Sequence, residues 1–432
     1  MSVELVSLIF VVGLLSLMAC GVPLGFAAGA LATAVALTNY GPDVVTIAHS
    51  IIYSLSTEYL LVSVPMFILM ASLLERSTIA HDLYSSLQRL VGNVTGGVAV
   101  VTLLLSVILA AMSGIIGGEI VLLGLVALPQ MLRLKYNRKL AIGTICAGGS
   151  LGTMIPPSIV LIVYGLVAEV PIHALFVAAV IPGLMLSGVY FLYIVARCAI
   201  DPTMAPAVSD EVRLSMPLSA ALVHLTPALF LLALIMFLIY GGVTSVTEAA
   251  CIGVVGALFL IVMRGEFSIK ILHESLVQTL RACGIILWVT FGANVLIGVY
   301  NLSGGRSFVK DLILSFDLPP MGVIAMMMVV FLLLGMVIDW IGIVFLTMPI
   351  FVPIIVGLGF DPVWFGVLFC MNMQVSFLSP PFAPAAFILK SVAPPDVTIQ
   401  EIFGAVWPFI ILQILTLTIV AIFPQISLWL VR

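Results

Sequence analysis

Polar side chains interrupt two long apolar stretches of this chain, and they are the residues best suited to chemistry. The hydroxyl groups in the first stretch belong to Ser150, Thr153 and Ser158, and those in the second to Ser376 and Ser379. Inside a membrane, unwound backbone carbonyls and neighbouring oxygens bind Na⁺, while half-helix N-termini suit anionic groups. The residue types therefore indicate binding of a small cation and an anion.

Two consecutive prolines break the first stretch where a helix should be continuous. No charge occurs from Leu140 to Ala168, yet Pro156 and Pro157 lie near the middle of this run. Each proline removes a backbone N–H and clashes with the preceding turn, so the pair ends a helix. In lipid, the freed backbone groups are tolerated only beside protein or a water-filled cavity. A single transmembrane proline is usually a structural kink, so one break alone leaves both interpretations open.

A second copy of the break favours a binding site over a kink. The Pro-Pro pair at 380–381 lies 224 residues after the pair at 156–157 (380 − 156 = 224). Pro129 and Pro353 show the same offset, which is about half of the 432 residues. The chain is therefore predicted to contain two repeats of one unit. Paired interrupted segments in corresponding halves are the best sequence indication of a secondary transporter's site.

The composition predicts an all-α polytopic membrane protein. Hydrophobic residues make up 63% of the chain and charged residues 8%, against roughly 25% charged residues in soluble domains. The net charge of −4 is too small to indicate a nucleic-acid partner. The six cysteines lie in or beside apolar runs, and no cluster of His, Cys or acidic residues provides a metal site or a nucleophile–base pair. We therefore expect a protein of the lipid bilayer that is not an enzyme and has no cofactor.

The first half of the chain predicts five membrane crossings. Its N-terminus is apolar from Leu5 without a preceding Lys or Arg, which favours a first transmembrane helix over a cleavable signal peptide. Residues 77–92 are too polar to span and predict an amphipathic helix at the interface. The predicted crossings are two helices within 5–38 that separate at 20–23, a third at 58–74, the broken helix at 140–168 and a fifth at 172–196.

The segment 96–132 is compatible with two full spans or with one re-entrant hairpin. It is apolar on both sides of a glycine-rich centre that runs from Ser113 to Glu119. Each arm holds about 16 residues, which at 1.5 Å per residue is short for the hydrocarbon core. We therefore predict a hairpin with its tip at the middle of the membrane.

The odd number of crossings predicts that the second half is inverted relative to the first. The basic cluster at 133–139 is expected in the cytoplasm, which places the N-terminus in the periplasm. All but three of the 15 Lys and Arg residues then face the cytoplasm, although charge was not used to orient the second half. The predicted equivalents are helices at 217–240, 249–263 and 282–300, an interfacial helix at 301–320, a hairpin at 321–355, a broken helix at 361–390 and a last span at 402–430.

Two hairpin tips and two broken helices together predict two cation sites and an anion site. For a single Ser or Thr, a hydrogen bond to its own or a neighbouring helix is the more common role, but these hydroxyls cluster around both breaks. The first candidate sodium site contains Ser113, Gly114, Gly149, Ser150, Gly152, Thr153 and Ile155. The second contains Asp339, Gly342, Ser376, Leu378 and Ser379. The candidate substrate-binding residues are Pro156, Pro157, Ser158, Pro380, Pro381 and Glu119.

Two carboxylates fall deep in predicted membrane segments, where a charge is costly and indicates function. Asp339 lies at the predicted second tip, where it could bind a cation or cap a half-helix. Glu119 has no acidic counterpart, because the 224-residue offset leads to Ile343. The sequence leaves open whether Glu119 is a capping residue, a proton carrier or a specificity element.

Over essentially its whole length the chain resembles the large membrane subunit (M subunit, DctM-like) of tripartite ATP-independent periplasmic (TRAP) transporters. The segments that carry this resemblance are AAMSG at 110–114, ALPQM at 127–131, GTICAGGSLGTMIPPSIVLIVYG at 143–165, IPG at 181–183, MPIFVPI at 348–354 and the Ser379-Pro380-Pro381 break. Two departures stand out. Family members often have more serines and a threonine after the first tip, where this chain has residues 115–119, and their second break is usually Thr-Pro-Pro-Val-Gly.

The resemblance implies a fold and a function. Members of this family are similar to elevator-type carriers of the ion transporter superfamily, in which a transport domain moves against a scaffold. It implies Na⁺-driven import of a small organic anion, a carboxylate or sulfonate, across the bacterial inner membrane. It also implies two partners, a periplasmic substrate-binding protein and a small four-helix membrane subunit. The alternative is a self-sufficient DASS-like anion symporter or an anion efflux carrier without a binding protein.

An elevator-type organisation divides the chain into a scaffold and a transport domain. The transport domain is predicted to combine the first hairpin and broken helix at 93–168 with their second copies at 321–392. The remaining units are the scaffold helices and first interfacial arm at 1–92, a crossing helix and cytoplasmic linker at 169–217, the inverted scaffold helices and second arm at 218–320, and the last helix at 393–432.

Overall fold

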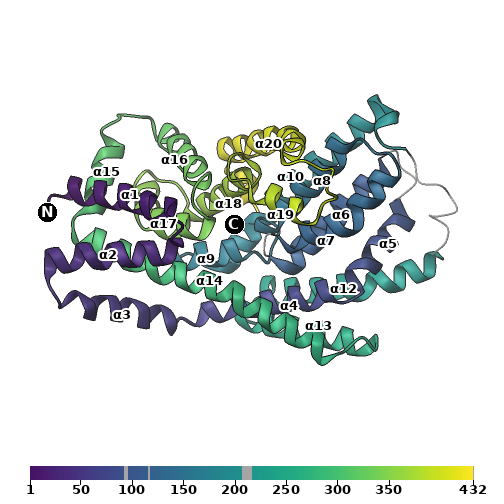
Figure 1. Ribbon diagram of the computed structural model, residues 1–432, viewed down its shortest axis with the longest axis horizontal. Helices are drawn as coiled ribbons and strands as arrows, with labels where there is room; N and C mark the ends of the chain where they lie inside the picture. Colours follow the sequence, from purple (N-terminus) through teal and green to yellow (C-terminus); the bar gives the residue numbers. More distant parts are fainter. Residues whose placement is uncertain (92–95, 115–116, 207–216, 432) are drawn as a thin grey trace.

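The computed structural model of the chain describes residues 1–91, 96–114, 117–206 and 217–431, and over these residues it contains helices and no strand. The side chains of residues 47 and 113 also lie outside the description, as do part of the predicted linker and part of the predicted first tip. Figure 1 shows an elongated molecule with α5 (Ile79–Val91) and α15 (Gly305–Leu314) near opposite ends of its long axis.

The chain divides at its midpoint into two successions of helices. The first contains α1 (Val3–Ala19), α2 (Leu24–Tyr40), α3 (Val44–Ser56), the 3₁₀ turn η1 (Tyr59–Val62), α4 (Ser63–Arg76), α5, α6 (Gly97–Ser113), α7 (Gly118–Arg133), α8 (Arg138–Ser150), η2 (Leu151–Thr153), α9 (Ile159–Ala168), α10 (Ile172–Ile200) and η3 (Pro202–Met204). The second contains α12 (Leu218–Tyr240), α13 (Val246–Met263), α14 (Ile269–Leu302), α15, α16 (Pro320–Gly335), α17 (Trp340–Gly357), α18 (Pro362–Leu378), α19 (Pro384–Val392), α20 (Ile399–Ile422) and α21 (Gln425–Leu428).

Seven helices within the described residues are long and apolar enough to cross a membrane. They are η1 with α4, then α10, α12, α13, α14, α17 and α20. Several of them direct large apolar side chains outward, as Phe237 of α12 and Phe259 of α13 do, with exposed fractions of 65% and 61%. Water would penalise such surfaces, whereas lipid tails are their natural surroundings.

The predicted interruptions of the backbone are confirmed. Helices α1 and α2 separate at the predicted turn, where Gly21 has a left-handed backbone and Pro23 precedes the new helix. Both Pro-Pro segments interrupt a helix, and the peptide bond within each pair is cis. The segments predicted as hairpins form the helix pairs α6–α7 and α16–α17, and those predicted as interfacial contain α5 and α15.

The clearest departures from the predicted elements are one unpredicted helix and two helix ends, because hydropathy locates apolar runs whereas the ends of a helix also depend on capping. Helix α3 was not predicted; it is an apolar helix of 13 residues, well short of the roughly 20 that a membrane span needs. Helix α14 begins 13 residues before the predicted 282 (282 − 269 = 13), where Ser268 caps it by accepting the N–H of Ile271 at 3.1 Å. The last span ends at Ile422, well before the predicted 430, because Pro424 cannot donate the next helical hydrogen bond.

The order of elements around the two breaks repeats along the chain. Adding 224 to the bounds of α6, α7, α8 and α9 gives 321–337, 342–357, 362–374 and 383–392. Helices α16, α17, α18 and α19 begin and end within four residues of these values.

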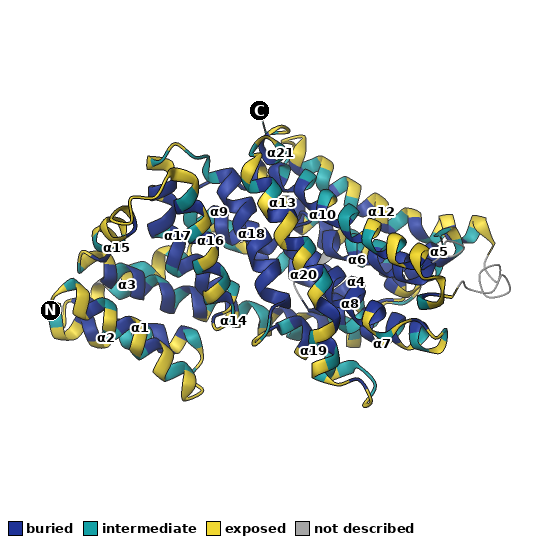
Figure 2. Cartoon of the chain, turned by 90° about the horizontal axis from the view of Figure 1, so that it is seen from above, coloured by how far each residue is buried: buried dark blue, intermediate teal, exposed yellow. Residues whose placement is uncertain are grey.

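Helices α2 and α14 pack differently from α18 and its neighbours. Helices α2 and α14 approach closely, and a Cβ on Gly292 would lie 1.9 Å from the carbonyl oxygen of Gly25, so both positions require glycine. Helix α18 lies at the centre, in contact with α8, α9, α10, α16, α17, α19 and α20. Figure 2 shows the difference, because α18 is largely buried whereas α1, α12 and α13 carry many exposed residues. The first part of the second broken helix is therefore surrounded by other helices on nearly all sides.

Candidate functional site

The tip of the first hairpin contacts the first break directly. Helix α6 ends at Ser113, and Gly114 then adopts a left-handed backbone with φ of +58°. Its carbonyl oxygen accepts the backbone N–H of Ile159, the first residue after the break, at 3.2 Å. A Cβ at Gly114 would lie 2.4 Å from the carbonyl oxygen of Pro157, so no other residue fits without displacing the break. The predicted meeting of tip and break is confirmed here, although the Ser113 side chain is outside the described residues.

Three hydroxyls surround the first break, and all three are fully buried. Ser150 Oγ donates to the carbonyl of Ala147 at 2.7 Å, and Thr153 Oγ1 donates to the carbonyl of Ser150 at 3.1 Å. Ser158 Oγ donates across the break to the carbonyl of Thr153 at 2.5 Å. Each hydroxyl donates its proton to a carbonyl, which leaves the oxygen lone pairs of Thr153 and Ser158 able to face a cation.

The other predicted residues of the first site are buried without a polar side chain of their own. Gly149 packs against the hairpin, since a Cβ there would lie 2.2 Å from Cγ1 of Ile120. Gly152 belongs to η2 and is buried, and Ile155 is 8% exposed. These residues can contribute only backbone carbonyls, which are the groups that an unwound segment offers to a cation.

Two glutamines that sequence reasoning missed complete the surroundings of Ser150. Gln374 of α18 donates its Nε2 to the Ser150 carbonyl at 3.2 Å, and Gln413 of α20 donates its Nε2 to Ser150 Oγ at 3.1 Å. Both side chains are at least 99% buried. Both glutamines could have been identified from the sequence as uncharged polar residues within apolar spans, and Gln374 also lies 224 residues after Ser150.

The second tip places a carboxylate beside the second break. Asp339 caps α17, because its Oδ2 accepts the N–H of Ile341 at 3.3 Å. Asp339 and Ser376 line the same small cavity, together with Gly335 and Phe382. Its volume of about 20 Å³ exceeds the roughly 10–15 Å³ that one water-sized particle requires. An anionic carboxylate, a hydroxyl and this volume suit one small cation.

Other predicted residues of the second site lie elsewhere. Gly342 faces α2, because a Cβ there would lie 2.2 Å from Cδ2 of Leu24. Leu378 is fully buried and Ser379 is 6% exposed, and neither lines the cavity. Ser379 Oγ donates to the carbonyl of Val375 at 2.7 Å, one helical turn earlier.

The predicted substrate-binding residues differ in accessibility. Pro156, Pro157 and Ser158 are buried, whereas Pro381 is exposed and Pro380 is intermediate. Glu119 lies in the first turn of α7 and is fully buried. Beside it, the carboxylate of Glu75 from α4 faces the first turn of α7, since a Cβ on Gly118 would lie 2.2 Å from Glu75 Oε1. Two carboxylates are therefore gathered at the positive end of one helix.

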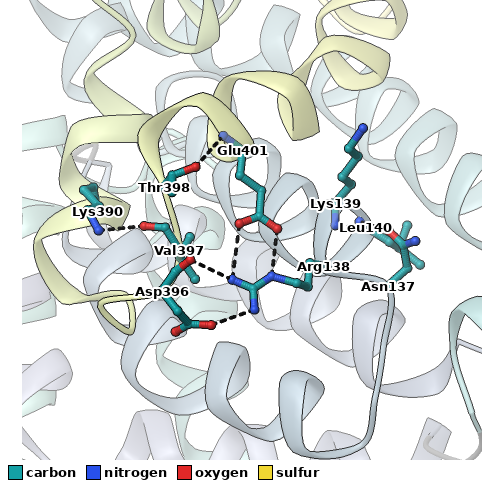
Figure 3. Close-up of polar contacts among 9 residues, drawn as sticks. All are labelled: Asn137, Arg138, Lys139, Leu140, Lys390, Asp396, Val397, Thr398 and Glu401. Carbon is teal, nitrogen blue, oxygen red and sulfur yellow. Dashed lines mark hydrogen bonds and ion pairs between the residues drawn. The ribbon is translucent and has the colours of Figure 1, made fainter.

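An ionic cluster joins the two broken helices away from their breaks (Figure 3). Arg138, the first residue of α8, contacts Asp396 and Glu401 at 2.7 Å each. Lys390 in the last turn of α19 donates to the carbonyl of Val397 at 2.6 Å. The Arg138 guanidinium lowers the pKa of Asp396 below its ordinary value. The start of the first broken helix is thereby tied to the segment that follows the second.

Comparison with known proteins gives a consistent result. Residues 11–426 match the family described as "Tripartite ATP-independent periplasmic transporter, DctM component". The chain is 31% identical over 407 residues to the C4-dicarboxylate TRAP transporter large permease protein DctM of Pseudomonas aeruginosa, covering 92% of each chain. It is also 31% identical over 381 residues to the ectoine TRAP transporter large permease protein TeaC of Halomonas elongata, covering 86% of each.

A solved structure confirms the all-helical, multi-span part of the predicted fold. The chain superposes on Neisseria gonorrhoeae MtrF with a TM-score of 0.63 at 12% identity, covering 91% of this chain and 85% of that one. Such a likeness supports an all-helical, multi-span membrane fold.

Proposed function

The chain belongs to the DctM family of tripartite ATP-independent periplasmic transporters, and on that premise we propose that it is a Na⁺-coupled permease that imports a small organic anion. As a transporter permease of this family it is not an enzyme. The observation that carries the proposal is the cavity where the carboxylate of Asp339 meets the hydroxyl of Ser376 beside the second break. A carboxylate within a membrane segment is stabilised when a cation neutralises it.

The substrate is proposed to be a small carboxylate or sulfonate. Relatives of this chain are named for C4-dicarboxylate and for ectoine, and both compounds carry a carboxylate. Helix N-termini at α9 and α19 follow the two breaks, and the positive ends of their dipoles suit an anion. A cation bound beside them would strengthen the anion site, so ion and substrate would bind cooperatively.

Transport is proposed to follow an elevator mechanism built on two inverted repeats. The repeat is supported by the offset of 224 residues in helix bounds and by the contact between Ser150 and Gln374 at that offset. Helices α6–α9 and α16–α19 would form the transport domain. The scaffold would contain α1–α4 and α12–α14, with α5 and α15 as connecting arms, and this division keeps the predicted domains.

The position in the membrane completes the proposal. The N-terminus is proposed to be periplasmic, and the cluster around Arg138 cytoplasmic, in the bacterial inner membrane. A tripartite system has two further components. They are proposed to be a periplasmic substrate-binding protein and a small four-helix membrane subunit.

Uptake by the complete system in proteoliposomes tests this function. The chain, its small subunit and its binding protein are reconstituted, and uptake of radiolabelled C4-dicarboxylates, ectoine and sulfonates is measured under an inward Na⁺ gradient. We expect uptake of one class of anion that collapses without Na⁺. Full-rate uptake that persists without Na⁺ under a proton gradient would contradict the coupling, and uptake by the chain alone would instead support the self-sufficient carrier.

A further inference from the structure

One buried hydrogen bond joins the two halves of the chain at equivalent positions. Gln374 Nε2 donates to the carbonyl oxygen of Ser150 at 3.2 Å, across a separation of 224 residues. Neither residue has any exposed surface. Equivalent residues of two repeats can touch only near the axis that relates the repeats, so this bond lies where both broken helices meet.

The carbonyl oxygen of Ser150 has no remaining capacity for a cation. It accepts Thr153 Oγ1 at 3.1 Å in addition to Gln374 Nε2, and a carbonyl oxygen has two lone pairs. A cation can therefore coordinate this oxygen only after one donor withdraws. The Thr153 hydroxyl can rotate and become a ligand itself, whereas the Gln374 amide has to move away with its side chain or its helix.

Gln374 is held by that one bond. Its Oε1 has no hydrogen-bond partner among the described residues, so breaking the contact with Ser150 releases the amide. A buried amide with one group unsatisfied is a costly arrangement.

The same helix reaches the second candidate site on its other face. Ser376 follows Gln374 by two residues, and each residue turns an α-helix by about 100°, so the two side chains point in roughly opposite directions. Ser376 lines the cavity that contains Asp339. Its Oγ also lies against the second tip, because a Cβ on Gly335 would approach it to 2.4 Å. A shift or rotation of α18 that adjusts Ser376 to a cation therefore also moves Gln374.

We propose that Gln374 is a positioning residue that couples the two candidate cation sites, because its amide occupies the Ser150 carbonyl until α18 responds to a cation at Asp339 and Ser376. This inference rests on the proposed function. Occupation of the second site opens the first, and by linkage a cation at the first site favours the second. Coupling of this kind typically changes affinity by about 5- to 150-fold.

Binding of ²²Na⁺ to the full-length chain in lipid nanodiscs, at constant ionic strength, tests the proposal. We expect a sigmoidal isotherm for the wild type. In Gln374→Met, which keeps the length of the side chain without its donor, the Hill coefficient should fall to about 1. Because the Ser150 carbonyl is then already free to bind a cation, half-saturation should occur at a Na⁺ concentration at least about 5-fold lower than in the wild type. Gln374→Asn, whose shorter amide does not reach Ser150, should behave in the same way and provides a second variant if the first does not fold.

Asn372→Leu is the matched control. Asn372 lies on the same helix and donates its buried Nδ2 to the carbonyl of Met328 at 2.9 Å, within the second half of the chain. This variant should unfold at a lower temperature and keep the wild-type Hill coefficient. The proposal is overturned if the wild-type isotherm is hyperbolic, if both Gln374 variants keep its shape, or if Asn372→Leu loses the cooperativity equally. A wild type that binds no Na⁺ would contradict the proposed function itself.

Discussion

The two broken helices share their spacing and their Pro-Pro pair, yet one is closed and the other is open. Every residue from Leu151 to Val160 is buried, whereas Pro381 and Phe382 at the second break are exposed. The equivalents differ in chemistry as well, since the 224-residue offset pairs the hydroxyl of Ser158 with the ring of Phe382. The same Pro-Pro break thus lies in two different environments, which are set by the elements packed around it.

One equivalent backbone group explains the difference. The N–H of Ile159 donates to Gly114 in the first hairpin tip at 3.2 Å, whereas the N–H at the equivalent position, Ala383, donates to Ser379 in its own break at 3.1 Å. The first break therefore depends on its tip, and the second is satisfied by itself. A tip that is not required for backbone hydrogen bonding leaves room for the cavity beside Asp339.

The largest expected effect comes from separating the first tip from its break. Gly114→Ala puts a side chain into a left-handed backbone, at about 1–2 kcal/mol, and its Cβ would also lie 2.4 Å from Pro157 O. We expect uptake to fall by more than about tenfold, which 1.4 kcal/mol already produces. Gly359→Ala is the matched control, because Gly359 has φ of +85° with no atom within 4 Å of the added Cβ. Equal losses in the two variants would show that the contact with the break is unimportant.

The next effect concerns the charge at the second break. Asp339→Asn keeps an efficient helix cap and removes the negative charge, so it separates the two roles that the sequence left open. Since interactions with a charged partner contribute about 1.5–3 kcal/mol, ²²Na⁺ affinity should fall at least about tenfold with little change in the unfolding temperature. A variant that unfolds earlier but binds Na⁺ normally would identify Asp339 as a cap only.

Thr153→Val is the corresponding change at the first break. Its hydroxyl already donates to a carbonyl, and removing a neutral hydrogen-bonding group costs about 0.5–1.5 kcal/mol. We expect a loss of Na⁺ affinity of about 2- to 10-fold, smaller than that of Asp339→Asn. An equal or larger loss would show that the first break, rather than the second, makes the more important contacts with Na⁺.

A comparable effect should distinguish the two serines of the second break. Both donate to the carbonyl four residues earlier, but only Ser376 lines the cavity with Asp339. Ser376→Ala should therefore reduce ²²Na⁺ affinity more than Ser379→Ala, by about 2- to 10-fold for the loss of one neutral oxygen ligand. The reverse order would move the cation site toward the Pro-Pro pair.

The interruptions of this fold could be predicted from sequence because they depend on local chemistry. Proline lacks an N–H wherever it lies, and glycine accepts a positive φ, so both breaks and the turn at Gly21 were predictable without tertiary information. The offset of 224 residues then located the second hairpin. Helix α3 escaped the same approach, because its 13 residues are fewer than the roughly 20 of a membrane span and include neither proline nor glycine.

The contacts of the site required the structure. Nothing in the sequence fixes how α18 is rotated about its axis, so the direction of Gln374 toward Ser150 and of Ser376 toward Asp339 was not predictable. The same holds for Gly342, which was predicted in a cation site and packs instead against Leu24. Residue type could therefore indicate the candidate region, but only the orientation of the helices shows which of its residues face one another.

The smallest expected effect concerns the outer ends of the broken helices, where the two copies differ again. Tyr164 OH of α9 donates to the carbonyl of Pro362, the first residue of α18, at 2.7 Å. The offset pairs Pro362 with Arg138, which makes ionic contacts to Asp396 and Glu401 instead. Only the end at Arg138 has carboxylate partners, so only its contacts should respond to acid.

Asp396→Asn measures that response. Because Arg138 lowers the pKa of Asp396 below its ordinary value of 3.8, the ionised carboxylate stabilises the folded state above that pH, and the contribution is lost as the pH falls through the lowered folded-state pKa. The unfolding temperature of the variant should lie slightly below that of the wild type at pH 7, since exposed ion pairs contribute little. The two proteins should converge below pH 3.8. Tyr164→Phe removes the uncharged contact at the other end, so its unfolding temperature should differ from that of the wild type by a constant amount over this pH range. If that difference also vanished in acid, the two ends would not differ in the way that their contacts indicate.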